Sequence, residues 1–295
     1  MKKIFKKYPA LVIFIIIALL LTLGFGGYEI VYHSLNHKQQ NMYEDLNKNA
    51  WIYDFSEDKP SESTEDPSIA ENEAKMKAFL ESVDDPDFYK KQLNSRPNFD
   101  TYLSVNDDVI GFILIPDTKI EYPVLQSDAR RDYYLKRNLD GSTGYPGCIY
   151  SENMNSKEFD DPVTILYGHN MQNGTMFGQL RKYYNNEEFL ESHKYIFIYQ
   201  PDCVKLYEVI AVSPYSDLHL LADDMRKDGS NVMFTGIKND DQIRVIDHLK
   251  EFGDAKAYFK DEELTEQDKI LVLSTCSGNR ARTIVAGKLL FSHKY

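Results

Sequence analysis

The chain has 295 residues, of which 42% are apolar, and a formal net charge of −12. This length allows one well-buried globular core with additional segments. An acidic surface repels phosphate backbones, which argues against nucleic-acid binding and leaves amine-bearing partners compatible. The three cysteines fit no zinc spacing and cannot all pair, so at least one thiol stays free. We expect Cys148 and Cys203 to be small buried residues in or beside strands, not a disulfide.

The chain begins with a basic tail and an uncharged apolar run over residues 10–25. With its flanks, the run is long enough to cross a hydrocarbon core of about 30 Å as a helix. Four lysines precede it, at positions 2, 3, 6 and 7. Positive residues stay on the cytoplasmic side, so we predict a cytoplasmic tail over 1–8 and a transmembrane signal anchor over 9–31. A cleaved signal peptide is the alternative, although no small-x-small cleavage site follows the run.

A polar, acidic stretch comes next. Between residues 51 and 73, eight acidic side chains stand against a single lysine, with prolines and serines interspersed. This composition predicts a solvated extracellular linker over 32–71 that holds the following domain off the membrane, in preference to an acidic ligand site. The folded domain is expected over 72–295. It begins with a helix over 72–93, whose apolar residues recur at helical spacing.

From Tyr102 onward, short β-type runs are separated by turn residues. The predicted strands cover 109–115, 119–125, 147–151, 163–168, 195–199, 204–215, 269–276 and 283–291. Two short helices are predicted among them, over 174–184 and 240–252. Eight strands without alternating long helices favour an antiparallel-rich barrel or sandwich over a doubly wound sheet.

Three residues with complementary chemistry stand at predicted strand ends. Cys276 ends a hydrophobic strand, and Arg282 begins the next one. His169 follows Gly168, which indicates a close backbone approach. Taken singly, these could be a buried thiol, a structural histidine and a solvated loop charge, and Arg280 competes with Arg282. Together they supply a nucleophile, a proton shuttle and an oxyanion stabiliser, and the sequence contains no phosphate loop or G-x-S-x-G motif that would suggest another site.

The motifs around these residues resemble those of the class B sortases of Gram-positive bacteria. LSTC at 273–276 resembles the strand-end T-L-x-T-C motif of the family, with Val272 in place of the usual Thr. YGHNMQNGTMFGQL at 167–180 resembles the class B histidine segment, and RTIVAGKLL at 282–290 resembles the strand that carries the family's arginine. The likeness covers about residues 72–291.

The resemblance implies a mainly β fold. It predicts the sortase-type eight-stranded β-barrel with an N-terminal helix and a few short peripheral helices, preceded by one transmembrane helix. The implied enzyme sits in the cell membrane as a single-pass protein with its N-terminus in the cytoplasm and its catalytic domain outside. Its partners are secreted proteins that bear a C-terminal sorting signal.

The resemblance also implies residue roles. Cys276 attacks the sorting motif and forms a thioacyl intermediate, and the acyl group is then transferred to an amine. His169 exchanges protons with the leaving and incoming amines, and Arg282, which aligns without a gap, stabilises the oxyanion in preference to Arg280. The same matching gives three candidate groove residues, Leu125, Ser274 and Thr275. No metal or cofactor is implied.

Several functional alternatives stay open at this point. The acceptor amine could belong to the cell-wall precursor, which would anchor surface proteins, or to a pilin lysine, which would polymerise pilins. A cysteine endopeptidase would use water instead of an amine. A non-catalytic, membrane-tethered binding module would keep its biological activity after Cys276→Ala.

Overall fold

The computed structural model of the protein describes residues 22, 27, 34, 37–48, 51–53, 67–216, 218–222, 236–276 and 281–295. The chain divides into two compact units, Met1–Asp45 and Leu46–Tyr295. Within the described ranges, none of the helices combines the length and the hydrophobicity that a membrane span requires. The predicted anchor over 9–31 lies almost entirely outside the described residues.

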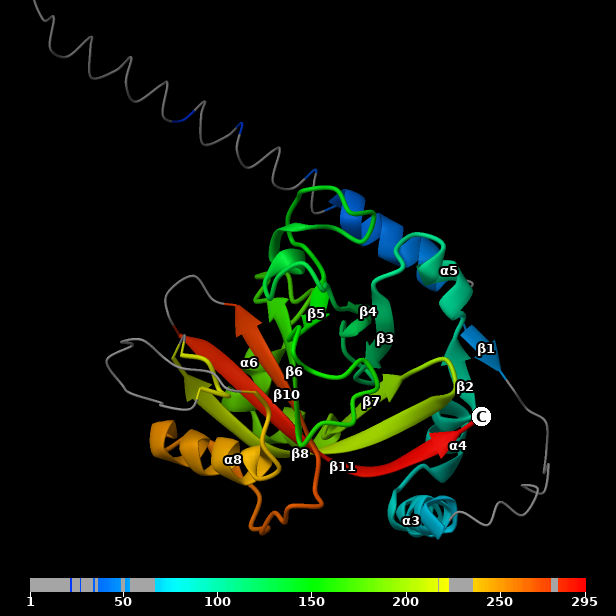
Figure 1. Cartoon of the computed structure of the whole chain (residues 1–295), viewed down its shortest axis with the longest axis vertical. Coiled ribbons are helices and arrows are strands. Elements are labelled where there is room, and N and C mark those ends of the chain that lie inside the picture. Colours follow the sequence, from blue (N-terminus) through cyan, green and yellow to red (C-terminus); the bar gives the residue numbers. More distant parts are fainter. Residues whose placement is uncertain are drawn as a thin grey trace, which may run out of the picture. The chain divides into compact units, whose positions relative to one another are not determined.

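The larger unit is built on a closed β-barrel (Figure 1). The barrel strands are β3 (Val109–Leu114), β4 (Glu121–Leu125), β5 (Ile149–Ser151), β6 (Val163–His169), β7 (Tyr195–Tyr199), β8 (Cys203–Tyr215), β10 (Ile270–Cys276) and β11 (Arg282–Lys294). They follow the order β11-β10-β6-β5-β4-β3-β7-β8, and β8 pairs with β11 to complete the ring. The short strand β9 (Tyr258–Phe259) adds to β8 outside it. The predicted eight-stranded barrel is therefore confirmed.

The longest strands, β8 and β11, close the barrel as an antiparallel pair. Each has 13 residues, and their register runs from Arg282 opposite Tyr215 to Lys294 opposite Cys203. The register shifts after Ala286 and again after Leu289. Such bulges increase local twist and bend a strand, which lets a long pair curve with the barrel wall. This closure sets Arg282 at the end of the barrel where β10 also ends.

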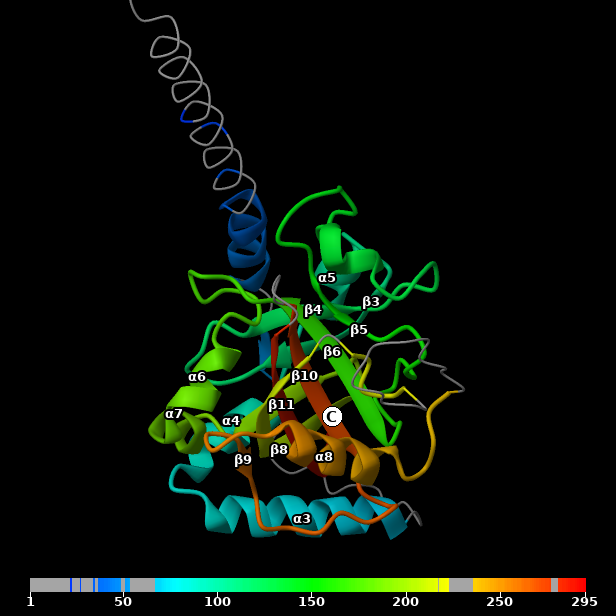
Figure 2. The same cartoon turned by 90° about the vertical axis from the view of Figure 1, so that its left-hand side faces the viewer.

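Helices cover parts of the barrel (Figure 2). They are α3 (Pro67–Ser82), α4 (Pro86–Leu93), α5 (Phe99–Leu103), α6 (Leu180–Asn185), α7 (Glu187–Ser192), α8 (Asp241–Phe252) and the 3-10 helix η1 (Tyr133–Lys136). The single helix expected over 72–93 is wrong, because the chain breaks between α3 and α4. There the Asp85 side chain caps α4 by accepting a 3.0 Å hydrogen bond from the Phe88 amide, and Pro86 occupies the first turn.

The described residues of the predicted linker over 32–71 include regular structure. Residues 37–47 are helical, and α3 already begins at Pro67. Strand β1 (Trp51–Tyr53) pairs antiparallel with β2 (Ser95–Pro97). The Trp51 ring packs edge-on against Phe112 and Tyr199, with centroids 5.8 and 5.2 Å away. The aromatic surface of one tryptophan thus fixes a short segment within an otherwise polar stretch.

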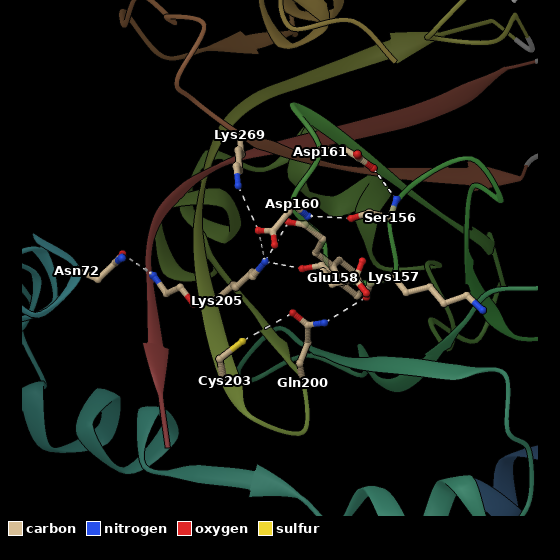
Figure 3. A network of polar contacts seen from close by, with 12 residues as sticks. Asn72, Ser156, Lys157, Glu158, Asp160, Asp161, Gln200, Cys203, Lys205 and Lys269 are labelled. Carbon is tan, nitrogen blue, oxygen red and sulfur yellow. Dashed lines mark hydrogen bonds and ion pairs between the residues drawn. The ribbon is translucent and has the colours of Figure 1, made fainter. Parts of the chain in front are cut away.

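A buried lysine on β8 fixes the loop between β5 and β6 (Figure 3). The Nζ atom of Lys205 donates to the carbonyl oxygens of Glu158 and Phe159, at 2.5 and 3.1 Å, and to the carboxylate of Asp160 at 2.8 Å. Burial alone would raise the pKa of the Asp160 carboxyl, but hydrogen bonds and charge from Lys205 and Lys269 outweigh it, and the pKa is lowered. The loop that delivers the chain into β6 is thereby held in place.

The two cysteines other than Cys276 lie in the interior of the fold. Cys148 and Cys203 are both buried, and the expectation that they form no disulfide with each other is confirmed. Burial, followed by the nearby Asp202 carboxylate, raises the pKa of the Cys203 thiol. A buried thiol with a raised pKa is a poor nucleophile.

Candidate active site

The candidate site begins with a strand pairing. Strands β6 and β10 are parallel neighbours, and their register runs from Ile270 opposite Val163 to Cys276 opposite His169. Neighbouring strands lie about 4.8 Å apart, so the backbones of these two predicted catalytic residues are side by side at the ends of their strands. The side chain of Cys276 and the whole of Arg280 lie outside the described part of the chain.

The imidazole of His169 is held by a carbonyl and an aromatic ring. Its Nε2 atom lies 2.9 Å from the carbonyl oxygen of Leu135, and its ring centroid is 4.8 Å from that of Tyr145. A carbonyl oxygen only accepts hydrogen bonds, so Nε2 carries a proton and Nδ1 is the basic nitrogen. Burial lowers the pKa of His169 despite the opposing hydrogen bond to Leu135, and the charge of Lys136 lowers it further. The ring is therefore neutral at pH 7.

The backbone at His169 is fixed by a tight packing contact. Its carbonyl oxygen accepts hydrogen bonds from the amides of Met171 and Phe177, at 3.2 and 3.0 Å. A Cβ atom on Gly168 would lie only 2.5 Å from Cδ1 of Ile149 and 2.7 Å from Cγ of Phe177. The close approach predicted at Gly168 is confirmed, and it places the end of β6 firmly against the segment that follows.

This backbone arrangement also changes a predicted helix. The amide of Phe177 donates to the His169 carbonyl, and the amide of Met176 donates to the Tyr122 hydroxyl at 3.0 Å. Met176 also has a φ of 52°, in the left-handed region, so the segment before Phe177 cannot form the first turn of a right-handed helix. The helix expected over 174–184 accordingly begins only at Leu180, as α6.

A cleft of about 220 Å³ lies beside the strand ends. The lining residues that matter for the chemistry are Arg131, Leu135, Tyr167, His219, Ser274 and Arg282. The guanidinium of Arg282 lies 6.0 Å from the ring centroid of Tyr167, and one of its nitrogens is 3.4 Å from the hydroxyl oxygen of Ser274. Leu135 links His169 to this cleft, because its carbonyl holds the imidazole. The structure therefore brings Arg282, Ser274 and the anchor of His169 to one cavity.

The three predicted groove residues have different environments. Ser274 lines the cleft. Thr275 is buried, and its hydroxyl oxygen accepts a 3.0 Å hydrogen bond from the amide of Thr283. Successive side chains of a strand point to opposite faces, which explains why Thr275 and Ser274 differ. Leu125 is completely buried beside its strand partner Tyr150 and does not line the cleft.

Sequence reasoning missed a polar cluster behind the cleft. Glu152 is completely buried, and its Oε2 atom accepts hydrogen bonds from the Tyr167 hydroxyl at 3.0 Å and from Nε2 of His219 at 2.7 Å. Burial, followed by the Glu152 charge, raises the pKa of Tyr167 well above its usual range, so the hydroxyl stays a donor. One signal was available: Tyr167 precedes His169 by two residues and so shares its strand face. Glu152 and His219 have no local signature.

Comparisons with known proteins agree with this fold and site. A sequence model described as the sortase domain matches residues 113–290. Sortase B of Listeria monocytogenes is 31% identical over 190 residues, which cover 63% of this chain and 71% of that protein. Sortase B of Staphylococcus aureus is 30% identical over 206 residues, which cover 68% of this chain and 78% of that protein.

The structural comparison gives the same result. The crystal structure of sortase B from B. anthracis in complex with AAEK1 has a TM-score of 0.52 and 28% sequence identity, covering 65% of this chain and 83% of that one. The chain therefore belongs to the sortase family, whose members are cysteine transpeptidases. Its relatives and structural neighbours are class B sortases, and it is a member of that class.

Proposed function

We propose that this class B sortase attaches secreted surface proteins to the cell wall, with Cys276 as nucleophile, His169 as proton-transfer residue and Arg282 as oxyanion stabiliser. The observation that carries the proposal is the pairing of Cys276 with His169 at the ends of adjacent parallel strands. Arg282 lines the neighbouring cleft together with Ser274. A nucleophile, a base and a fixed cation at one location are what acyl transfer requires.

In the first half-reaction, neutral His169 takes the thiol proton of Cys276, and the sulfur attacks the carbonyl carbon of the sorting motif's threonine. The carbonyl oxygen becomes an oxyanion, to which the Arg282 guanidinium donates hydrogen bonds. The carbon–nitrogen bond then breaks, and the imidazolium gives its proton to the leaving amine. The products are a thioester on Cys276 and the released C-terminal segment.

In the second half-reaction, an acceptor amine attacks the thioester carbonyl and loses a proton to His169. The carbon–sulfur bond breaks, and the thiolate of Cys276 takes that proton back. The enzyme ends in its starting state, and one peptide bond has been exchanged for another. The lowered pKa of His169 supports this scheme, because the resting ring is neutral and can accept a proton at pH 7.

The location of the enzyme belongs to the same proposal. The apolar run within 9–31 follows four lysines and has the length of a membrane span. We infer that it anchors the protein with the catalytic unit outside the cell. There a membrane-bound transpeptidase can meet secreted proteins as they emerge and amines of the wall precursor.

The decisive experiment is a peptide-cleavage screen with the purified full-length protein in detergent. Fluorogenic peptides that contain Pro and Thr in varied sorting motifs are incubated with no amine, with a wall stem peptide that has a free amine, or with a lysine-bearing pilin-type peptide. Products are identified by mass spectrometry, and Cys276→Ala is the inactive control. We expect cleavage of one motif class and a product that contains the added stem peptide.

Each other outcome of the screen would assign a different function to the protein. Hydrolysis that added amines do not change would indicate a cysteine endopeptidase. Preferential joining to the lysine peptide would indicate a pilin polymerase. If wild type cleaves no Pro- and Thr-containing peptide, the proposed reaction is refuted, and a tethered binding module becomes the better description.

A further inference from the structure

The carboxylate of Glu152 is an unusual group for the interior of a barrel enzyme. Glu152 follows β5 directly and its side chain is completely buried. Its Oε2 atom accepts the hydrogen bonds from Tyr167 and His219, and its Oε1 atom has no hydrogen-bond partner, with the Nε atom of Arg131 3.9 Å away. A buried charge is costly unless it is paired. Its presence beneath the cleft calls for a function that the proposed reaction does not yet use.

The contacts of Tyr167 connect this carboxylate to the proposed oxyanion stabiliser. Tyr167 lies on β6 directly opposite Ser274 of β10. Its ring stacks on Tyr150, with centroids 5.4 Å apart, and faces the guanidinium of Arg282 at 6.0 Å. Arg282 also approaches the hydroxyl of Ser274 at 3.4 Å. The ring of Tyr167 is thus a support for the guanidinium, and Glu152 holds the far end of that ring through the hydroxyl.

The second donor, His219, keeps the carboxylate in this position. It comes from the described segment 218–222 after β8, and its Nε2 atom binds the same oxygen as the Tyr167 hydroxyl. Its Nδ1 atom accepts a 3.2 Å hydrogen bond from the amide of Leu221, so the ring is fixed at both nitrogens. Two donors on one oxygen leave the carboxylate little freedom to rotate. The position of Glu152 is therefore set from two sides of the cleft.

We propose that Glu152 is a positioning residue for Arg282, acting through the hydroxyl and ring of Tyr167. The inference rests on the proposed role of Arg282 in the reaction. Without the Glu152 carboxylate, the Tyr167 hydroxyl loses its buried acceptor, the ring shifts, and the guanidinium no longer meets the oxyanion at the required distance. The side-chain contacts of Glu152 are with Tyr167, His219 and Arg131 and not with His169, so we expect the reactivity of the thiol to be kept.

The test is a double-mutant cycle in the full-length protein, with Glu152→Ala, Arg282→Ala and the double variant. Two quantities are measured: kcat for sorting-peptide cleavage, and the rate at which iodoacetamide alkylates Cys276. A displacement of about 1 Å can cost roughly 100-fold, so we expect Glu152→Ala to lower kcat by roughly 10- to 100-fold. The alkylation rate should stay at the wild-type value. In the Arg282→Ala background, Glu152→Ala should lower kcat by no more than about twofold, because the group that it positions is already absent.

Two further variants keep the inference testable if Glu152→Ala does not fold. Tyr167→Phe removes only the hydroxyl and should lower kcat in wild type but not in the Arg282→Ala background. Glu152→Gln keeps an oxygen that can accept both hydrogen bonds and should recover most of the activity lost in Glu152→Ala.

Three outcomes would overturn the proposal. Wild-type kcat in both Glu152→Ala and Tyr167→Phe would show that the contact is not needed. Equal losses in the wild-type and Arg282→Ala backgrounds would show that Glu152 acts independently of Arg282. A wild-type kcat in Arg282→Ala itself would remove the role on which the inference rests, even when the peptide screen has already established transpeptidation.

Discussion

The Nε2 atom of His169 donates a hydrogen bond to the carbonyl oxygen of Leu135 at 2.9 Å, which leaves Nδ1 as the only basic nitrogen of the ring. Because burial lowers the pKa of His169, the base form persists below the ordinary histidine value of 6.5. We therefore expect the acid limb of the pH profile of kcat/KM to fall below pH 6.5.

The same lowered pKa predicts how the free energy of unfolding depends on pH. The unfolded chain binds the extra proton between the folded pKa and 6.5, so stability rises with pH across that window.

The matched variant for this prediction is Tyr145→Ala. Removing the ring that packs on His169 exposes the imidazole to water, which should return its pKa towards 6.5 and shift the acid limb upward. His193→Gln, on a helix end outside the cleft lining, serves as a control that should leave the limb in place. An acid limb at or above pH 6.5 in wild type would contradict the assignment of His169, with its lowered pKa, as the base.

The proposed roles predict a ranking of active-site variants. Cys276→Ala and His169→Ala should abolish peptide turnover, because the nucleophile or the proton shuttle is lost. Arg282→Ala should lower kcat by at least about 100-fold, as for loss of an oxyanion donor. Arg280→Ala should be mild, and the exposed Arg181 gives a control substitution that should leave kcat unchanged. If Arg280→Ala proves to be the severe variant, the role of Arg282 passes to Arg280.

The packing at Gly168 predicts a stability defect from one added methyl group. In Gly168→Ala, the new Cβ would overlap Ile149 and Phe177, and overpacking of this kind costs about 1–3 kcal/mol. Urea unfolding measures this cost, and kcat should also fall because His169 shares the displaced backbone. Phe177→Leu is the partner substitution: combined with Gly168→Ala, it should cost less than the sum of the two single changes. Strict additivity would show that the overlap is relieved elsewhere.

The buried amine of Lys205 predicts a second defect, away from the cleft. Lys205→Met leaves the carbonyl oxygens of Glu158 and Phe159 without their donor, at a cost of about 1–3 kcal/mol. The lowered pKa of Asp160 adds stability that is present above its ordinary value of 3.8 and is lost as the pH falls through the folded pKa. The difference between variant and wild type should therefore shrink in acid. Lys269→Met, which removes the more exposed partner of Asp160, should have the smaller effect in urea unfolding.

Much of the fold follows from local pattern. Each barrel strand was visible as a short apolar or alternating run, and the absence of alternating long helices excluded a doubly wound sheet. The break between α3 and α4 was missed, although Asp85 and Pro86 are a cap and a first-turn residue that the sequence displays openly. Strand β1 was missed because the environment of Trp51 is created by Phe112 and Tyr199, from distant strands.

Some residues of the candidate site could be predicted from the local sequence pattern, and others could not. Cys276, His169 and Arg282 could be selected because each stands at an end of a strand that the sequence pattern predicts. Glu152 and His219 could not, because a carboxylate after one strand and a histidine in a distant loop meet only after the barrel has closed. Leu125 was selected by motif matching alone, and its complete burial follows from its place between β3 and β5.

The closing pair of strands also sets the order in which the enzyme can become active during synthesis. Strand β11 follows every other barrel strand in the chain, and it both completes the ring with β8 and carries Arg282. A nascent chain that includes Cys276 but not yet β11 therefore has an open barrel and lacks Arg282. If the proposed role of Arg282 holds, we expect chains terminated before β11 to be inactive in peptide cleavage although they contain Cys276.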